Sequence, residues 1–96
     1  MIVIEGTIRV PDMERARPHM ETVITATRAE DGCIHYAFAI DLFDPNLIHI
    51  SERWTSREAL SSHAKSDHIA TWRAAGPGLG ISDRSLRLYE AEPEAI

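Results

Sequence analysis

The apolar residues of this chain switch between two periods, and this switching constrains the fold more than any other feature of the sequence. From Ile2 to Val10, successive side chains alternate between an apolar and a mixed face, which is typical of a half-buried strand. From Met13 to Ala29, apolar residues recur at helical spacing, and residues 30–32 then form a stop signal. Each change of period therefore marks a new element.

Two more strands are predicted over residues 33–41 and 47–54, joined by a turn at residues 44–46. The first of these is apolar on both faces, with one set of side chains on each: Ile34, Tyr36, Phe38 and Ile40 against Ala37 and Ala39. A strand that is apolar on both faces is normally covered on both sides. We therefore expect a second layer on each face of the sheet at this strand.

A helix that is split in two follows the third strand. Thr55 and Glu58 fit a capping box, in which the threonine hydroxyl and the glutamate close the helix start reciprocally. Ser66 looks like a second cap that opens a short helix. Residues 76–80 are glycine-rich and lack the lysine and serine or threonine of a phosphate loop, so they are predicted to be a connector or a flexible lid before a last strand over residues 86–89.

The first helix contains Pro18, which removes one donor and clashes with the carbonyl four residues earlier. We therefore expect a kink there, or a first turn that begins irregularly. This irregularity does not change the order of the elements.

The order strand–helix–strand–strand–helix–strand predicts an α+β, ferredoxin-like βαββαβ fold, with a four-stranded antiparallel sheet that carries its helices on one face. The other face then needs a partner, and the simplest partner is a second copy of the chain across a two-fold axis. The sequence predicts a homodimer through the sheet face. Arg53 is assigned to that interface, as a partner of Glu5.

Composition limits the remaining classes of protein. The 96 residues are expected to form a single domain over residues 1–96, with a frayed tail at 91–96. The net charge of −5 and the scattered arginines argue against nucleic acid as a partner. No apolar run approaches the roughly 20 residues that span a membrane. Without a basic stretch at its start, and with Cys33 as its only cysteine, the chain is expected to be cytoplasmic.

Glu52 and Trp54 share the strand phase that is predicted to face the helices. Trp54 would form an aromatic wall for a planar substrate, or would simply pack in the core. A carboxylate such as Glu52 is costly to bury unless it is paired. It would orient a histidine or bind a substrate hydroxyl, or it would form a structural pair with an arginine or with backbone amides.

His63 and His68 lie at the break in the split helix and are the candidate general bases, because imidazole exchanges its proton near neutral pH. The alternative for each is a histidine satisfied by a backbone carbonyl. As metal ligands the two are badly spaced on an unbroken helix, although the break could correct the geometry. No cysteine or further histidine stands at ligand spacing, although His35 and His49 could approach on the other face of the sheet. No metal site is expected.

Three aromatic residues complete the predicted pocket. Tyr36 and Phe38 share the inward strand phase, and Trp72 would cap the pocket from the helix side. Core packing is the alternative for all three. Cys33 has no activating neighbour in the sequence and is expected to be unreactive.

The chain resembles the antibiotic biosynthesis monooxygenase (ABM) family at Glu30-Asp31-Gly32-Cys33 with Tyr36, and at Glu52-Arg53-Trp54, Glu58-Ala59-Leu60, His63 and Ser66-Asp67-His68. The resemblance runs from about Ile2 to Tyr89. It implies a dimeric α+β barrel with a pocket in each subunit, between the sheet and its helices. It also implies oxygenation without flavin or metal. The family includes oxygenases, haem degraders and isomerases, so membership alone does not select a reaction.

Together the residues and the resemblance predict a monooxygenase without cofactors that acts on dioxygen and a small electron-rich aromatic, such as a quinol or polyphenol. His63 or His68 would be the base. The alternatives are an isomerase or tautomerase of a small hydroxy-carbonyl compound, and a ligand-binding module without catalysis. Haem is not expected, because Ile8 stands where the haem-degrading branch carries asparagine, and Arg73 stands near the place of its iron-binding histidine.

Overall fold

Four antiparallel strands in the spatial order β2–β3–β1–β4 form the sheet of this protein, which a computed structural model describes over residues 1–96. The elements follow in chain order: β1 (Ile2–Arg9), α1 (Met13–Arg28), β2 (Cys33–Ile40), β3 (Leu47–Trp54), α2 (Arg57–Ala64), α3 (Asp67–Ala75), the short 3₁₀ helix η1 (Pro77–Leu79) and β4 (Ser82–Glu90). This confirms the α+β, ferredoxin-like fold, with the second helix split into α2 and α3. None of the helices has the length and apolar character needed to cross a membrane.

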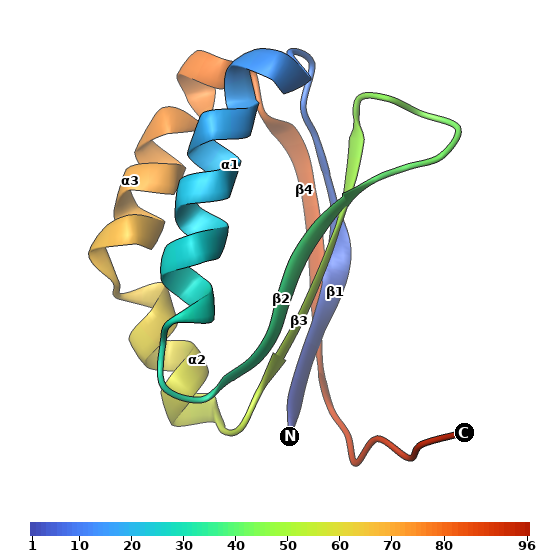
Figure 1. Cartoon of the computed structure of the whole chain (residues 1–96), viewed down its shortest axis with the longest axis vertical. Coiled ribbons are helices and arrows are strands. Elements are labelled where there is room, and N and C mark those ends of the chain that lie inside the picture. The colour runs from blue at the N-terminus through green and yellow to red at the C-terminus, as the bar shows by residue number, and fades with distance from the viewer.

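The helices all lie on one face of the sheet (Figure 1). α1 and α3 lie side by side over the strands, and α2 lies near the end of the sheet where β3 finishes. The hairpin loop between β2 and β3 projects away from the helices (Figure 1), and it exposes Leu42 and Phe43. The opposite face of the sheet carries no element of this chain.

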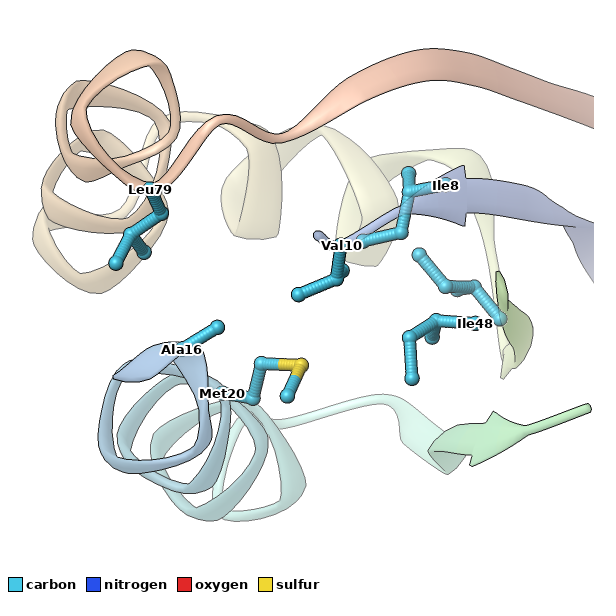
Figure 2. Packing of buried hydrophobic residues seen from close by; sticks show 7 residues of the cluster. Ile8, Val10, Ala16, Met20, Ile48 and Leu79 are labelled. Atoms are coloured by element: carbon cyan, nitrogen blue, oxygen red, sulfur yellow. The ribbon is translucent and has the colours of Figure 1, made fainter. Parts of the chain in front are cut away.

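The inner face of the sheet and the helices enclose an apolar core. Its larger cluster joins the strands to α1 and η1 (Figure 2), through Ile8, Val10, Ala16, Met20, Ile48, Ile50 and Leu79. A smaller cluster at the other end of the sheet contains Ile2, Tyr36 and Trp54. Leu79 packs in this core and anchors the glycine-rich segment 76–80, which connects α3 to β4.

The strand phases agree with the predicted pattern except at the start of β2. The pairing of β2 with β3 is irregular between Cys33 and His35. These two residues pair with Trp54 and Arg53, which are neighbours in β3, so β2 has one extra residue at this point. Ile34 sits at this irregularity and is 45% exposed. The prediction that it shares the inward face with Tyr36 and Phe38 was therefore wrong.

The start of α1 is regular: the helix begins at Met13, where Asp12 Oδ1 accepts a hydrogen bond from Arg15 N at 3.1 Å, and it continues past Pro18 to Arg28. Of the two expectations for Pro18, the irregular first turn is therefore wrong. The start of α2 also needs correction. The cap of α2 is Ser56 rather than Thr55: Ser56 Oγ accepts from Ala59 N at 3.1 Å. Thr55 lies between the end of β3 and this cap, and its N–H donates to the Gly32 carbonyl at 2.9 Å.

The chain ends lie at the same end of the molecule (Figure 1). The amino group of Met1 donates to the Ala91 carbonyl at 2.9 Å and contacts Glu92 Oε1 at 3.3 Å. Residues 91–96 belong to no helix or strand and are exposed.

Candidate functional site

A cavity of about 300 Å³ lies between the inner face of the sheet, α3 and the start of β4. Most of its wall is apolar, and three buried polar side chains gather at one end. Its lining includes five of the seven residues that the sequence predicted for the site: Tyr36, Phe38, Glu52, His63 and Trp72.

The polar end is formed by Glu52 from β3, Tyr36 from β2 and His63 from α2, and all three are buried. Glu52 and Tyr36 are direct partners across β2 and β3, so the strand register places their side chains together. His63 comes from the last turn of α2 and completes the group.

Burial raises the pKa of Glu52, while a hydrogen bond from Trp54 and the charge of His63 act in the opposite direction. Trp54 Nε1 donates to Glu52 Oε1 at 3.0 Å. One carboxylate oxygen of Glu52 is thus held by the protein, and the carboxyl group lines the cavity.

Burial also raises the pKa of Tyr36, and the nearby carboxylate of Glu52 adds to the shift. The phenol therefore keeps its proton at neutral pH and is a hydrogen-bond donor, not a base. A donor and an acceptor thus lie side by side at the polar end of the cavity.

His63 is held in place by a carboxylate and by aromatic rings. Its Nδ1 lies 2.6 Å from Glu30 Oε2, and its side chain is 7% exposed. The ring centroid lies 4.7 Å from that of Trp54 and 5.4 Å from that of Tyr36. A ring that packs against two aromatic rings and is bonded at one nitrogen has little freedom to turn.

Glu30 was not predicted as a site residue, because the sequence pattern indicates only a helix stop at this position. It stands just beyond α1, 33 positions before His63, and its side chain is 17% exposed. The strand and helix periodicities say nothing about a residue in a connection. Glu30 is one of two carboxylates before the turn at Gly32, and nothing in the sequence separates it from the exposed Asp31.

His68 lies outside the cavity. The break between α2 and α3 turns it back toward Glu30, whose Oε2 lies 3.3 Å from His68 Nε2. Ser66 Oγ lies 3.2 Å from the same nitrogen. Ser66 also caps α3, as predicted: its Oγ accepts from Ile69 N at 3.4 Å and donates to the His63 carbonyl at 2.7 Å.

The apolar wall is aromatic on the helix side. Trp72 packs against Phe38 with ring centroids 5.9 Å apart, and both line the cavity. Trp54 does not line it. This tryptophan is fully buried and supports Glu52 and His63 from behind.

Two arginines that the sequence analysis did not assign to the site lie along the cavity: Arg73 from α3 and Arg84 from β4. Asp83, which adopts the left-handed backbone conformation at φ 53°, lies beside Arg84. The charge of Arg84 lowers the pKa of Glu52, against the effect of burial. The cavity therefore offers positive charge as well as an apolar wall.

Other candidate residues lie apart from the cavity. Burial raises the pKa of the Cys33 thiol, so this cysteine is protonated at neutral pH, in agreement with its predicted lack of reactivity. Arg53 is exposed on the outer face of the sheet. Within the chain, Glu5 bonds to Tyr89 rather than to Arg53. The Tyr89 hydroxyl donates a hydrogen bond to Glu5 Oε1 at 3.0 Å.

One group of three side chains has the donor atoms to hold a metal ion. Glu30, His63 and His68 each offer one such atom, and these atoms lie within 4.8 Å of one another. His35 and His49 lie elsewhere, where His35 contacts Ser51 at 2.8 Å and His49 contacts Asp41 at 2.7 Å.

Two known proteins are similar to this chain in sequence. It is 31% identical over 98 residues to sll1783 of Synechocystis, an uncharacterized protein, and this match covers 99% of the chain and 67% of the relative. It is 41% identical over 68 residues to Rv0793 of Mycobacterium tuberculosis, named as a candidate monooxygenase, covering 67% of the chain and 63% of the relative. The matched regions thus span about two thirds of each relative.

Solved structures agree with this relationship. A candidate antibiotic biosynthesis monooxygenase from Deinococcus radiodurans superposes with a TM-score of 0.90 at 30% identity, covering 100% of this chain and 96% of that chain. The structure of Rv0793 superposes with a TM-score of 0.82 at 28% identity, covering 100% of both chains. The sequence matches the antibiotic biosynthesis monooxygenase family over residues 1–75. The chain therefore belongs to the antibiotic biosynthesis monooxygenase family.

Proposed function

We propose that this protein is a monooxygenase without cofactors that oxidises a small electron-rich aromatic, such as a quinol or polyphenol. The observation that carries the proposal is the Glu30–His63 contact of 2.6 Å at the polar end of a largely apolar cavity. A buried imidazole bonded to a carboxylate at one nitrogen is a common arrangement for a general base.

His63 is proposed as the base. When Nδ1 donates to Glu30, the neutral ring carries its proton there, and Nε2 is left as an acceptor. This nitrogen would take the proton of a substrate hydroxyl. Glu52 would accept a hydrogen bond from a second hydroxyl, and Tyr36 would donate one to a substrate oxygen.

The substrate would supply the electrons. Deprotonation gives a phenolate, which passes one electron to dioxygen, and the resulting radicals join through a new carbon–oxygen bond. The peroxide takes up the proton that His63 removed, and loss of water then breaks the oxygen–oxygen bond together with the carbon–hydrogen bond at the same ring carbon. One oxygen atom stays on the product as a carbonyl, the other leaves as water, and the substrate supplies all the electrons that reduce dioxygen. The apolar wall of Phe38 and Trp72 would keep water away from the intermediate.

Oxygen uptake with a panel of quinols tests the proposal. His63→Ala should lower the rate by about 10²–10⁴-fold, the usual contribution of a general base. His68→Ala, made in parallel, compares the two histidines that the sequence could not rank. Equal rates in the wild type and both variants would remove the histidines from the mechanism.

An isomerase or tautomerase of a small hydroxy-carbonyl compound is the second candidate. The observation in its favour is that Glu52, with a pKa raised by burial, faces the same cavity as His63 and could return a proton. Exchange of substrate hydrogen with solvent deuterium, without oxygen consumption, would select this reaction. Thermal stabilisation by a bound aromatic with no turnover would instead favour a ligand-binding module without catalysis.

We also propose that two copies of the chain associate through the outer face of the sheet. The helices cover only the inner face (Figure 1), and Val3 and Ala37 on the outer face are half-buried within a single chain. A two-fold pairing of these faces is the simplest closed arrangement. Sedimentation at micromolar concentration should give a dimer, and a monomer would contradict this part of the proposal.

A further inference from the structure

Glu30, His63 and His68 converge from three separate segments of the chain. Glu30 lies just past α1, His63 in the last turn of α2 and His68 in the first turn of α3. Glu30 Oε2 is 2.6 Å from His63 Nδ1 and 3.3 Å from His68 Nε2. We propose that these three side chains bind a divalent transition-metal ion, with Zn²⁺ as the simplest case.

The donor atoms suit such an ion. Imidazole nitrogen and carboxylate oxygen bind Zn²⁺ at about 2.0–2.2 Å, so neighbouring ligands of a tetrahedral ion lie about 3.3 Å apart. The Glu30–His68 separation already has this value, at 3.3 Å. The Glu30–His63 separation of 2.6 Å must open by about 0.7 Å, the difference from that tetrahedral distance.

The site is largely assembled before any ion arrives. His63 is packed against the rings of Trp54 and Tyr36, and Ser66 ties α2 to α3 by its bond to the His63 carbonyl. Side chains that are already ordered lose little entropy when they bind a ligand.

The site also has an open side. The side chains of Glu30 and His68 are 17% and 22% exposed, against 7% for His63. Three protein ligands and one open position form the arrangement in which Zn²⁺ keeps a water molecule. Two imidazoles and one carboxylate also suit Fe²⁺ and Co²⁺, so geometry alone does not select one metal.

Metal binding would change the state of the proposed base, and this consequence alone rests on the proposed function. The ion would occupy His63 Nδ1, so the neutral ring would have to carry its proton on Nε2. The ring could then no longer accept a substrate proton at that nitrogen. Metal-bound and catalytically competent forms would be alternative states of one cluster.

Direct metal binding tests the site without any activity assay. The full chain, freed of any polyhistidine tag and treated with chelator, is titrated with Zn²⁺ against a chromogenic competitor, and with Co²⁺ by visible absorption. The expected result is one ion per chain. His68→Ala and Glu30→Gln should each weaken binding at least about 10-fold, since even residues behind metal ligands commonly contribute 10–100-fold.

His49→Ala is the matched control. His49 also pairs with a carboxylate, 2.7 Å from Asp41 Oδ2, but it has no second histidine beside it. Its substitution should leave Zn²⁺ affinity unchanged. Circular dichroism checks that each variant is folded, and His63 itself is left unchanged in both test variants.

Two results would overturn the proposal. One is no saturable binding by the folded wild type. The other is a loss of affinity in His49→Ala that equals the loss in His68→Ala. Because nothing here depends on turnover, failure of the oxygenase proposal would not affect the outcome, and a protein that binds no metal could still be an oxygenase.

Discussion

Glu30→Ala should destabilise the fold although the residue lies in a connection. Removing this carboxylate leaves the Nδ1 donor of a nearly buried His63 without its partner at 2.6 Å. Leaving a buried donor unsatisfied costs about 1–3 kcal/mol. For a domain of this size, about 2 kcal/mol corresponds to a Tm lower by roughly 8–16 °C.

The assay is urea and thermal unfolding of the full chain at one fixed protein concentration, since a dimer's stability depends on concentration. A chelator is included so that bound metal does not contribute. Glu30→Gln keeps an acceptor oxygen and should lose less stability than Glu30→Ala. Asp31→Ala, at the neighbouring exposed carboxylate, is the control and should lie within about 0.5 kcal/mol of the wild type.

Equal stability of Glu30→Ala and Asp31→Ala would contradict the prediction that Glu30 stabilises the fold through His63. That result would mean that water or another group satisfies His63 once the carboxylate is gone. The Glu30–His63 contact would then be incidental to the fold, and its use to orient a base would lose its support.

Two further predictions concern stability. Gly32→Ala should cost about 1–3 kcal/mol in denaturant unfolding, the usual range for a strained backbone position, because Gly32 has φ +82° and an added Cβ would lie 2.5 Å from Ala59 Cβ and 2.8 Å from Thr55 Oγ1. Gly78→Ala, where nothing lies within 4 Å, should be tolerated, and equal losses would contradict the argument. Glu52→Gln should be more stable than the wild type near pH 7, since burial raises the folded pKa of Glu52 above its unfolded value and makes the ionised form costly. This stability advantage of Glu52→Gln should shrink as the pH falls through the folded pKa of Glu52. An advantage that grows on acidification would contradict the prediction.

Much of the fold could be predicted from periodicity. The strand phase placed Tyr36, Phe38 and Glu52 on the face that lines the cavity, and the helical spacing turned His63 toward the sheet. These are local properties, because a strand or helix determines which side chains share a face. The break that Ser66 makes was also predictable from its capping chemistry.

The errors arose where long-range contacts override local signals. Thr55 fits a cap as well as Ser56 does, but its N–H bonds to the carbonyl of Gly32, far away in sequence, and the helix begins one residue later than predicted. Ile34 follows the strand pattern, but an irregularity in the pairing of β2 and β3 shifts its phase. A pattern within one segment cannot detect either effect.

The site was predicted least well where it depends on connections. Glu30 comes from the segment after α1, and Arg84 comes from the start of a strand that was expected to begin later, at residue 86. Both reach the site only through the tertiary arrangement. His68 shows the reverse case, in which a plausible pocket residue is turned away by the break beside it.

Incorporation of labelled oxygen tests the central claim most directly. Chelator-treated protein is incubated with a panel of quinols under ¹⁸O₂, and the products are analysed by mass spectrometry. The account predicts a product that carries a single labelled oxygen atom, formed without added metal or flavin, and a rate that falls by about 10²–10⁴-fold in His63→Ala. Products without label, or labelled product formed equally fast by His63→Ala, would contradict it.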